Sequence, residues 1–253
     1  MKLTTLGCGT FVPQAKKNPA GFLVETGDKT ILLDAGYGVI RRLLDAGRDL
    51  QAIDLVFTSH FHPDHFSDTF NLIFCRKGNS MIMKKPARTL AILGPAGLKK
   101  RFNLWQKNLW PEWETLNQTY PVRFLEGACT VRLGGTRIKT FDVFHIKWFK
   151  SLGVVIESGK KKIAYFGDLG PKNDIGRLAA AARNTDLLVC EASVAAASEV
   201  HLTAEQARAL SEAAGAKTTL LVHVSPPNEV SVAEFCAKTP GFILASDGMT
   251  FEI

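Results

Sequence analysis

The sequence has no apolar run that approaches the roughly 18 consecutive residues required by a membrane-spanning helix. Its first ten residues are interrupted by threonines and glycines, so they predict a strand and a turn rather than a secretion signal. The five cysteines, an odd number, are scattered without C-x-x-C spacing, which fits reduced and mostly buried thiols. We therefore expect a cytoplasmic protein with no membrane segment.

Linkers, low-complexity tracts and strong internal repeats are also missing. Hydrophobic residues make up 46% of the 253 residues and charged residues 22%, which is typical of a globular protein with a full core. The sequence therefore predicts a single domain that spans residues 1–253.

Acidic residues are absent from residues 69–111, a stretch that carries nine bases. The bases are Arg76, Lys77, Lys84, Lys85, Arg88, Lys99, Lys100, Arg101 and Lys107. The rest of the chain contains 22 bases and 24 acids, so the excess of positive charge is concentrated in this stretch. We expect this basic segment, residues 76–107, to bind an anionic partner such as RNA, and a solvated face without a partner is the alternative. Trp105, Trp110 and Trp113 lie among these bases and suit base stacking, although packing is the commoner role of tryptophan.

The hydrophobic pattern predicts alternating strands and helices. Residues 22–26 and 29–34 predict a hairpin, and residues 203–214 a helix that begins with a capping box. Residues 77–85 show no clear pattern and predict a loop. Residues 242–245 and 249–253 predict a hairpin that closes the chain.

Three of the six histidines fall within residues 60–65, in an H-x-H-x-D-H cluster directly after an apolar run. Its members are His60, His62, Asp64 and His65. In an extended stretch, residues two apart point the same way, so His60 and His62 can bind one ion together. Imidazole and carboxylate suit zinc and similar divalent ions. The cluster predicts a metal site, and a histidine-rich surface loop is the alternative.

Three further candidate ligands each follow a predicted apolar strand. They are His145, Asp168 and His223. Because ligand sites in α/β sheets gather at the carboxyl ends of strands, we expect these side chains to converge on the cluster.

The order H-x-H-x-D-H, His, Gly-Asp, His resembles the metallo-β-lactamase superfamily over nearly the whole chain. The resemblance implies an α+β (α/β) fold, a four-layer αββα sandwich with two divalent metal ions at one edge. One ion would bind His60, His62 and His145. The second would bind Asp64, His65 and His223, and Asp168 would bridge the two. Zinc is the expected metal, and manganese and iron fit the same donors.

Within that superfamily the chain most resembles ribonuclease Z and its phosphodiesterase relatives. Residues 10–18 resemble a P-x-K-x-R-N stretch with the spacing off by one, and residues 190–193 an H-E-A-T motif with Cys190 in place of histidine. Residues 201–203 resemble an H-S-T motif. By this resemblance His201 would act on the leaving group, oriented by Glu191, and Asp64 would serve in catalysis as well as in metal binding. An ordinary residue at a helix N-terminus is the alternative for His201.

Ribonuclease Z carries a long arm that grips tRNA, usually between the positions that match His145 and Asp168. Here that gap is 23 residues, enough for one hairpin and no arm. The resemblance implies a phosphodiesterase or endoribonuclease that uses a metal-bridging hydroxide, with a role in tRNA processing, and it favours a homodimer. A hydrolase of carbonyl or sulfate esters is the second hypothesis, and a nucleic-acid-binding protein with structural metal is the third.

Overall fold

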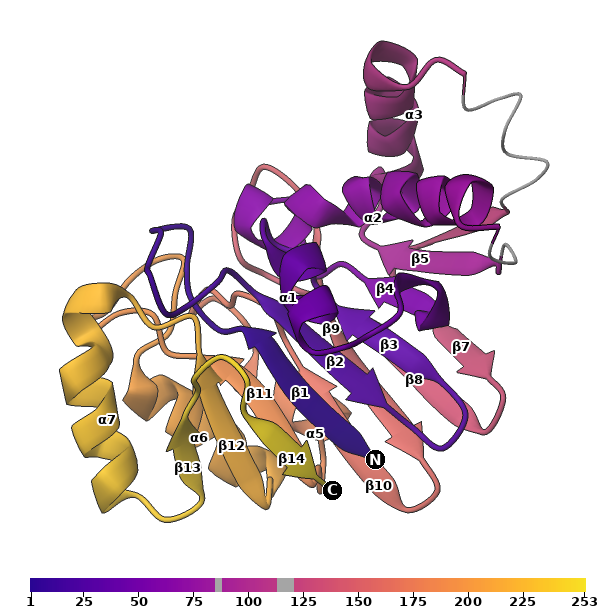
Figure 1. The fold of residues 1–253 in the computed structure, drawn as a ribbon. Coiled ribbons are helices and arrows are strands. Elements are labelled where there is room, and N and C mark those ends of the chain that lie inside the picture. Colours follow the sequence, from indigo (N-terminus) through magenta and orange to yellow (C-terminus); the bar gives the residue numbers. More distant parts are fainter. Residues whose placement is uncertain (85–87, 113–120) are drawn as a thin grey trace.

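The structure, a computed structural model, describes residues 1–84, 88–112 and 121–253. Within these residues the strands form two seven-stranded sheets that lie face to face, and helices cover the outer face of each sheet (Figure 1). The fold class predicted from the sequence, a four-layer αββα sandwich, is confirmed.

The first sheet has the strand order β14-β1-β2-β3-β4-β5-β6. Its strands are β1 (Lys2–Gly7), β2 (Gly21–Glu25), β3 (Thr30–Leu33), β4 (Leu55–Phe57), β5 (Leu90–Gly94), β6 (Val122–Glu126) and β14 (Thr250–Glu252). From β3 to β6 neighbouring strands are parallel. Their carboxyl ends therefore meet at one edge of the sheet.

The outer face of the first sheet is covered by α1 (Val39–Asp45), α2 (Pro63–Ile82) and α3 (Leu98–Leu109), and a short 3-10 turn, η1 (Leu50–Ala52), precedes β4. Pro63 occupies the first turn of α2, where its missing N–H costs nothing. The loop predicted for residues 77–85 is wrong as far as Ile82, because α2 continues to that residue. Lys85 lies outside the described residues.

The second sheet has the order β13-β12-β11-β10-β9-β8-β7. Its strands are β7 (Thr130–Leu133), β8 (Thr136–Val143), β9 (Ser151–Ser158), β10 (Lys161–Tyr165), β11 (Leu187–Glu191), β12 (Thr218–Val222) and β13 (Phe242–Leu244). Strands β7 to β10 are antiparallel to their neighbours, and β10 to β13 are parallel.

The outer face of the second sheet is covered by α5 (Ile175–Ala181), α6 (Ala204–Ala214) and α7 (Glu229–Lys238), with the 3-10 turn η3 (Pro226–Asn228) before α7. The predicted capping box of α6 is confirmed, because the Thr203 side chain accepts from the Gln206 N–H and the Gln206 side chain accepts from the Thr203 N–H. No helix within the described ranges has both the length and the apolar character needed to cross a bilayer.

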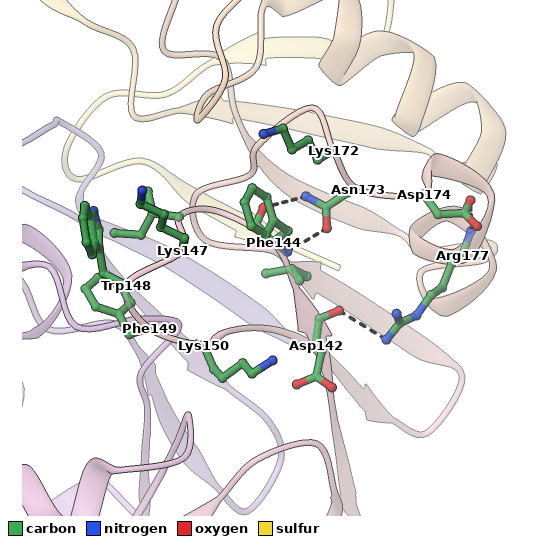
Figure 2. A pocket seen from close by; sticks show the side chains of 12 residues that line it. Asp142, Phe144, Lys147, Trp148, Phe149, Lys150, Lys172, Asn173, Asp174 and Arg177 are labelled. Carbon is green, nitrogen blue, oxygen red and sulfur yellow. Dashed lines mark hydrogen bonds between the residues drawn. The ribbon is translucent and has the colours of Figure 1, made fainter.

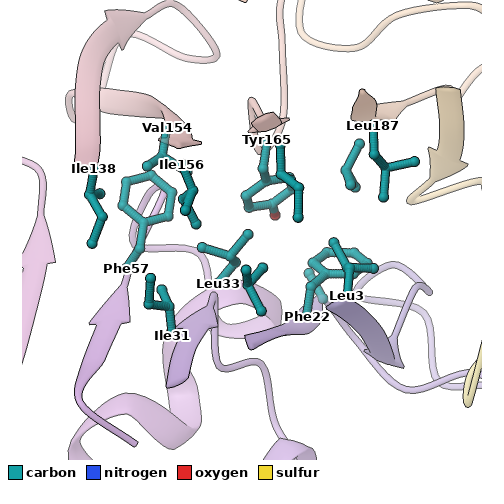
Figure 3. Packing of buried hydrophobic residues seen from close by; sticks show 14 of the residues in the cluster. Leu3, Phe22, Ile31, Leu33, Phe57, Ile138, Val154, Ile156, Tyr165 and Leu187 are labelled. Carbon is teal, nitrogen blue, oxygen red and sulfur yellow. The ribbon is translucent and has the colours of Figure 1, made fainter. Parts of the chain in front are cut away.

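Three layers of apolar side chains hold the sandwich together. The central layer lies between the two sheets, where Phe22, Leu33 and Phe57 of the first sheet face Ile156 and Tyr165 of the second (Figure 3). The other two layers pack each sheet against its own helices. Alternate residues of each strand enter one layer or the other, since successive side chains of a strand point to opposite faces.

The hairpin predicted at the end of the chain is wrong. Strand β13 pairs with β12 in the second sheet, and β14 pairs with β1 in the first. The segment between them crosses from one sheet to the other, and its Ala245 and Met249 backbones bond to Leu221 and Thr5. The sequence signals two short strands separated by a turn, but it does not show which partner each strand takes.

Candidate metal centre

The seven predicted metal ligands lie together at the edge where the carboxyl ends of the central strands meet. His60 and His62 follow β4, and Asp64 and His65 occupy the first turn of α2. The others follow β8, β10 and β12, and they are His145, Asp168 and His223. Their donor atoms fall into overlapping groups, each within 4.8 Å: His60, His62, His145 and Asp168 in one, Asp64, His65 and His223 in another, and Asp168, His201 and His223 in a third.

The first group places the nitrogen atoms of three imidazole rings close together. His62 Nδ1 lies 3.0 Å from His60 Nε2 and 3.4 Å from His145 Nε2. Burial lowers the pKa of all three rings, that of His60 well below its ordinary value. The rings are therefore neutral at pH 7, and each keeps a nitrogen lone pair for a metal ion.

The second group combines one carboxylate with two imidazoles. His223 Nε2 lies 3.2 Å from Asp64 Oδ2, and His65 Nε2 lies 3.7 Å from the same oxygen. Burial alone lowers the pKa of His65, but the carboxylates of Asp168 and Asp34 outweigh it and raise that pKa well above its ordinary value. An ion that binds here therefore displaces a proton from His65.

Asp168 lies between the two groups. Its Oδ2 is 3.8 Å from His60 Nε2 and 3.6 Å from His223 Nε2, and its Oδ1 is 3.3 Å from His65 Nε2. Among the described residues, Asp168 Oδ1 and His65 Nε2 are buried atoms without a hydrogen-bond partner. Buried polar atoms rarely stay unpaired in a folded protein. A divalent cation between these donors satisfies them, so the residues present fit the metals that the donor set suits.

A buried carboxylate, Asp34, supports the first-sheet side of the centre. It follows β3 with a positive φ of 54°, and its oxygens accept hydrogen bonds from the Ser59 N–H and hydroxyl (2.6 Å each), His65 Nδ1 (2.7 Å) and the Tyr165 hydroxyl (2.6 Å). Ser59 Oγ in turn lies 3.0 Å from His60 Nδ1. Because the serine gives its proton to Asp34, His60 Nδ1 is the donor to Ser59, which leaves Nε2 free to face a metal.

Glu191, the last residue of β11, supports the second-sheet side. Its carboxylate accepts from the Leu169 N–H (2.6 Å), the Ser193 hydroxyl (2.5 Å) and His201 Nδ1 (3.0 Å). Ser193 Oγ also lies 2.8 Å from His223 Nδ1. By the same logic His223 donates from Nδ1 and keeps Nε2 for an ion.

His201 lies beside both groups, with its ring centroid 5.2 Å from that of His145 and 5.5 Å from that of His223. Burial opposes its charge, but the hydrogen bond and charge of Glu191 raise the pKa of His201 to about 9. The ring is therefore protonated at neutral pH, and its side chain is 19% exposed. His201 is therefore a cationic imidazole at the edge of the metal centre that can act as a proton donor.

The loop that resembles the P-x-K-x-R-N stretch is anchored next to the centre. Asp247 accepts from both the backbone N–H and the side-chain amide of Asn18 (2.8 and 2.9 Å), and from the Cys8 N–H (3.1 Å). Cys8 O then accepts from the His223 N–H at 2.8 Å. Asp247 therefore joins the loop to the segment that carries a predicted ligand.

Sequence reasoning missed Ser59, Tyr165, Ser193 and Asp247, because each acts through a partner distant in the chain. The departure from the H-E-A-T motif is also explained: Cys190 is fully buried in the apolar layer beneath α6, and burial raises the pKa of its thiol. Its side chain therefore packs in this apolar layer.

The basic segment, residues 76–107, is not one continuous cationic surface. Arg76 and Lys77 are buried, and the Arg76 guanidinium donates to the backbone carbonyls of Ile53 and Arg88. Arg101 lies 4.0 Å above the ring of Phe61. Lys84, Lys99, Lys100 and Lys107 are exposed. Two of the nine bases therefore lie in the interior and are not available to a partner.

The tryptophans within the basic segment pack rather than project. Trp110 is 7% exposed, and both Trp105 and Trp110 belong to the apolar layer between the first sheet and its helices. Trp113 lies outside the described residues. The exposed tryptophan is Trp148, in the loop that follows His145, at 75% exposure.

Comparisons with known proteins agree with this geometry. A family model described as a β-lactamase superfamily domain matches residues 29–224. The ribonuclease Z of Archaeoglobus fulgidus is 23% identical over 312 aligned positions, which cover 100% of this chain and 97% of that protein. The metallo-β-lactamase fold protein YhfI from Bacillus subtilis is 23% identical and superposes with a TM-score of 0.80, over 99% of this chain and 98% of that one. The short form of human tRNase Z is 22% identical, with a TM-score of 0.76 over 100% of this chain and 99% of that one.

Proposed function

Because the chain belongs to the β-lactamase superfamily and is a metal-dependent hydrolase, we propose that it cleaves phosphodiesters in the manner of ribonuclease Z. The observation that carries the proposal is the combination of two donor groups, with Asp168 between them, and His201 beside them, hydrogen-bonded to Glu191. A phosphodiester is an anion with a poor leaving group, and such a substrate needs both charge neutralisation and a proton donor.

The residues of the centre fall into proposed metal ligands and a proposed general acid. His60, His62 and His145 would hold one ion, Asp64, His65 and His223 the other, and Asp168 both. Two such ions, when bound, neutralise the phosphodiester and activate a water nucleophile. Zinc fits these donors best, and manganese and iron also fit.

His201 would donate its proton to the departing oxygen. Its Nδ1 is bonded to Glu191, so Nε2 is the nitrogen left to face a substrate. Glu191 fixes the ring and keeps it charged, and it is itself held by Leu169 N–H and Ser193. General acid catalysis of this kind accelerates a reaction by about 10²–10⁴-fold.

We further propose RNA as the substrate class, on the strength of the archaeal ribonuclease Z matched along the whole chain. Lys99, Lys100 and Lys107 on α3 are among the exposed bases of the basic segment that would attract it. A cytoplasmic location is supported by the cysteines, since all five are free. A homodimer is expected from the resemblance, and light scattering on the purified protein tests it.

The first test is hydrolysis of bis(p-nitrophenyl) phosphate by zinc-loaded and manganese-loaded protein. We expect turnover with either ion and none in Asp168→Ala, because this variant removes the carboxylate shared by the two groups. Mass spectrometric metal analysis of both proteins accompanies the assay. A wild type that holds two ions and leaves the substrate intact would refute the phosphodiesterase and favour a hydrolase of carbonyl or sulfate esters.

A further inference from the structure

A cavity of about 730 Å³ is lined in part by the loop that follows His145 (Figure 2). Residues 146–150, the loop between His145 and β9, line one side of it, and residues 172–177, which lead into α5, line the other. This loop is short, because β9 starts six residues after His145. The cavity therefore takes lining residues from both sides of a predicted metal ligand, His145, in the sequence.

Phe149 connects the cavity to the metal-binding histidines. Its ring is stacked on His60, with centroids 5.9 Å apart at 25°, and meets His62 edge-on at 5.1 Å. Phe149 also lines the cavity. One side chain therefore contacts both the cavity and the side of the centre formed by His60 and His62.

Trp148 offers the cavity an open aromatic surface. It is 75% exposed, and Lys147 Nζ lies 4.7 Å from its ring centroid. The cation–π contact with Lys147 stabilises the position of the indole, and an exposed aromatic ring among basic side chains is the setting in which nucleobases stack on a protein.

The cavity is also positively charged. Lys147, Lys150, Lys172 and Arg177 line it, all exposed, against two carboxylates, Asp142 and Asp174. The Asp174 carboxylate is already bonded to the Arg177 N–H, where it caps α5. Cations thus outnumber anions, which favours a ligand that carries phosphate.

We propose that this cavity binds the nucleotide adjoining the scissile phosphate, with its base stacked on Trp148 and its phosphate oxygens near Lys150 and Lys172. The proposal rests on the phosphodiesterase function and assigns the residues that would recognise the base and the adjoining phosphate. In this proposal the short loop after His145 takes part in substrate recognition.

The kinetic test compares two substrates with the same leaving group, thymidine 5′-(p-nitrophenyl phosphate) and methyl p-nitrophenyl phosphate. Wild type should prefer the nucleoside substrate, and Trp148→Ala should lower the ratio of the two kcat/KM values by roughly 5- to 150-fold, the range for one stacked base. Trp148→Phe should restore most of the ratio. A ratio that stays at the wild-type value in Trp148→Ala overturns the proposal.

A binding measurement separates this proposal from the catalytic one. Calorimetry on the metal-loaded protein compares thymidine 5′-monophosphate with 2-deoxyribose 5-phosphate, which lacks only the base. We expect tighter binding of the nucleotide in wild type and equal binding in Trp148→Ala. Equal affinity in wild type, or no binding of the nucleotide, refutes the cavity assignment even if phosphodiesters are cleaved. Tight nucleotide binding without any turnover would refute the phosphodiesterase alone.

The charged residues have a matched control. Lys150→Ala and Lys172→Ala should each weaken binding of thymidine 5′-monophosphate by about twofold to fivefold, with a shallower dependence on salt. Lys160→Ala removes an equally exposed lysine from the β9–β10 turn, at the opposite end of the second sheet, and should leave the affinity unchanged. Losses of equal size in all three variants would mean that only the net charge matters.

Discussion

Asp34 and Glu191 make equivalent hydrogen-bond networks, one in each sheet. Each is a fully buried carboxylate at the carboxyl end of a strand, β3 or β11. Each accepts hydrogen bonds from a backbone N–H, a serine hydroxyl and a histidine Nδ1, and each serine touches a further histidine of the centre.

The two networks differ in the solvent exposure of the histidine that each carboxylate binds. Asp34 fixes His65, whose side chain is 1% exposed and faces Asp168, whereas Glu191 fixes His201, whose side chain is 19% exposed. Asp34 also bonds Tyr165 in the core between the sheets, which ties it to the fold. The first network therefore serves metal binding and stability, and the second presents a proton donor to a substrate. Perturbing each network in turn tests this division.

The largest expected effect lies in the Glu191 network. His201→Ala should lower kcat for bis(p-nitrophenyl) phosphate by about 10²–10⁴-fold, because it removes the proposed proton donor. Metal content and Tm should stay near wild type, since His201 is outside the seven predicted ligands. Full activity in this variant would exclude His201 as the acid, and a loss of metal would place it among the ligands instead.

Asp34→Ala should act on stability rather than on the chemical step alone. It leaves four buried donors without an acceptor, and breaking a buried charged network costs about 3–5 kcal/mol in the free energy of unfolding. Thermal denaturation and metal analysis measure the two consequences. Asp34→Asn is the matched control, because asparagine tolerates the positive φ of this position and keeps one acceptor.

A wild-type Tm in Asp34→Ala would contradict the division between the networks. Tyr165→Phe calibrates the result, since it removes one of the donors to Asp34 and should cost only about 1.5–3 kcal/mol.

The smallest effect is expected for Ser193→Ala. This change removes the acceptor of His223 Nδ1 without touching a proposed ligand. Loss of such a supporting bond typically weakens metal binding by about 10–100-fold. Competition with a chelator measures it, and Ser193→Thr, which keeps the hydroxyl, should bind as wild type does. If both ions are held as tightly in Ser193→Ala, the serine has no part in orienting His223.

The centre could be predicted from the sequence because its residues obey local rules. The H-x-H-x-D-H cluster lies within six residues, and His145, Asp168 and His223 each follow a buried strand. The ligand groupings stay predictions that the geometry supports. Ser59, Ser193 and Tyr165 could not be found this way, because a serine or tyrosine in a strand or turn carries no mark of its distant partner.

The errors have a common origin in tertiary contacts. Arg76 looked like a surface cation, yet carbonyls of Ile53 and Arg88 satisfy its guanidinium in the interior. For Trp110 the sequence left base stacking and packing open, and in the structure Phe74 and Trp105 pack against it. Composition shows which residue types are near in sequence, and it does not show which of them the fold buries.

The crossing between the last two strands has a consequence for how the protein is made. Strand β1 is synthesised first, but its outer neighbour is β14, so β1 has an open edge until residues 250–252 have left the ribosome. The Asp247 contacts to Cys8 and Asn18 wait for the same event. Completion of the first sheet therefore waits for these residues, and the nascent chain passes through a stage in which β1 is open to pairing with other chains.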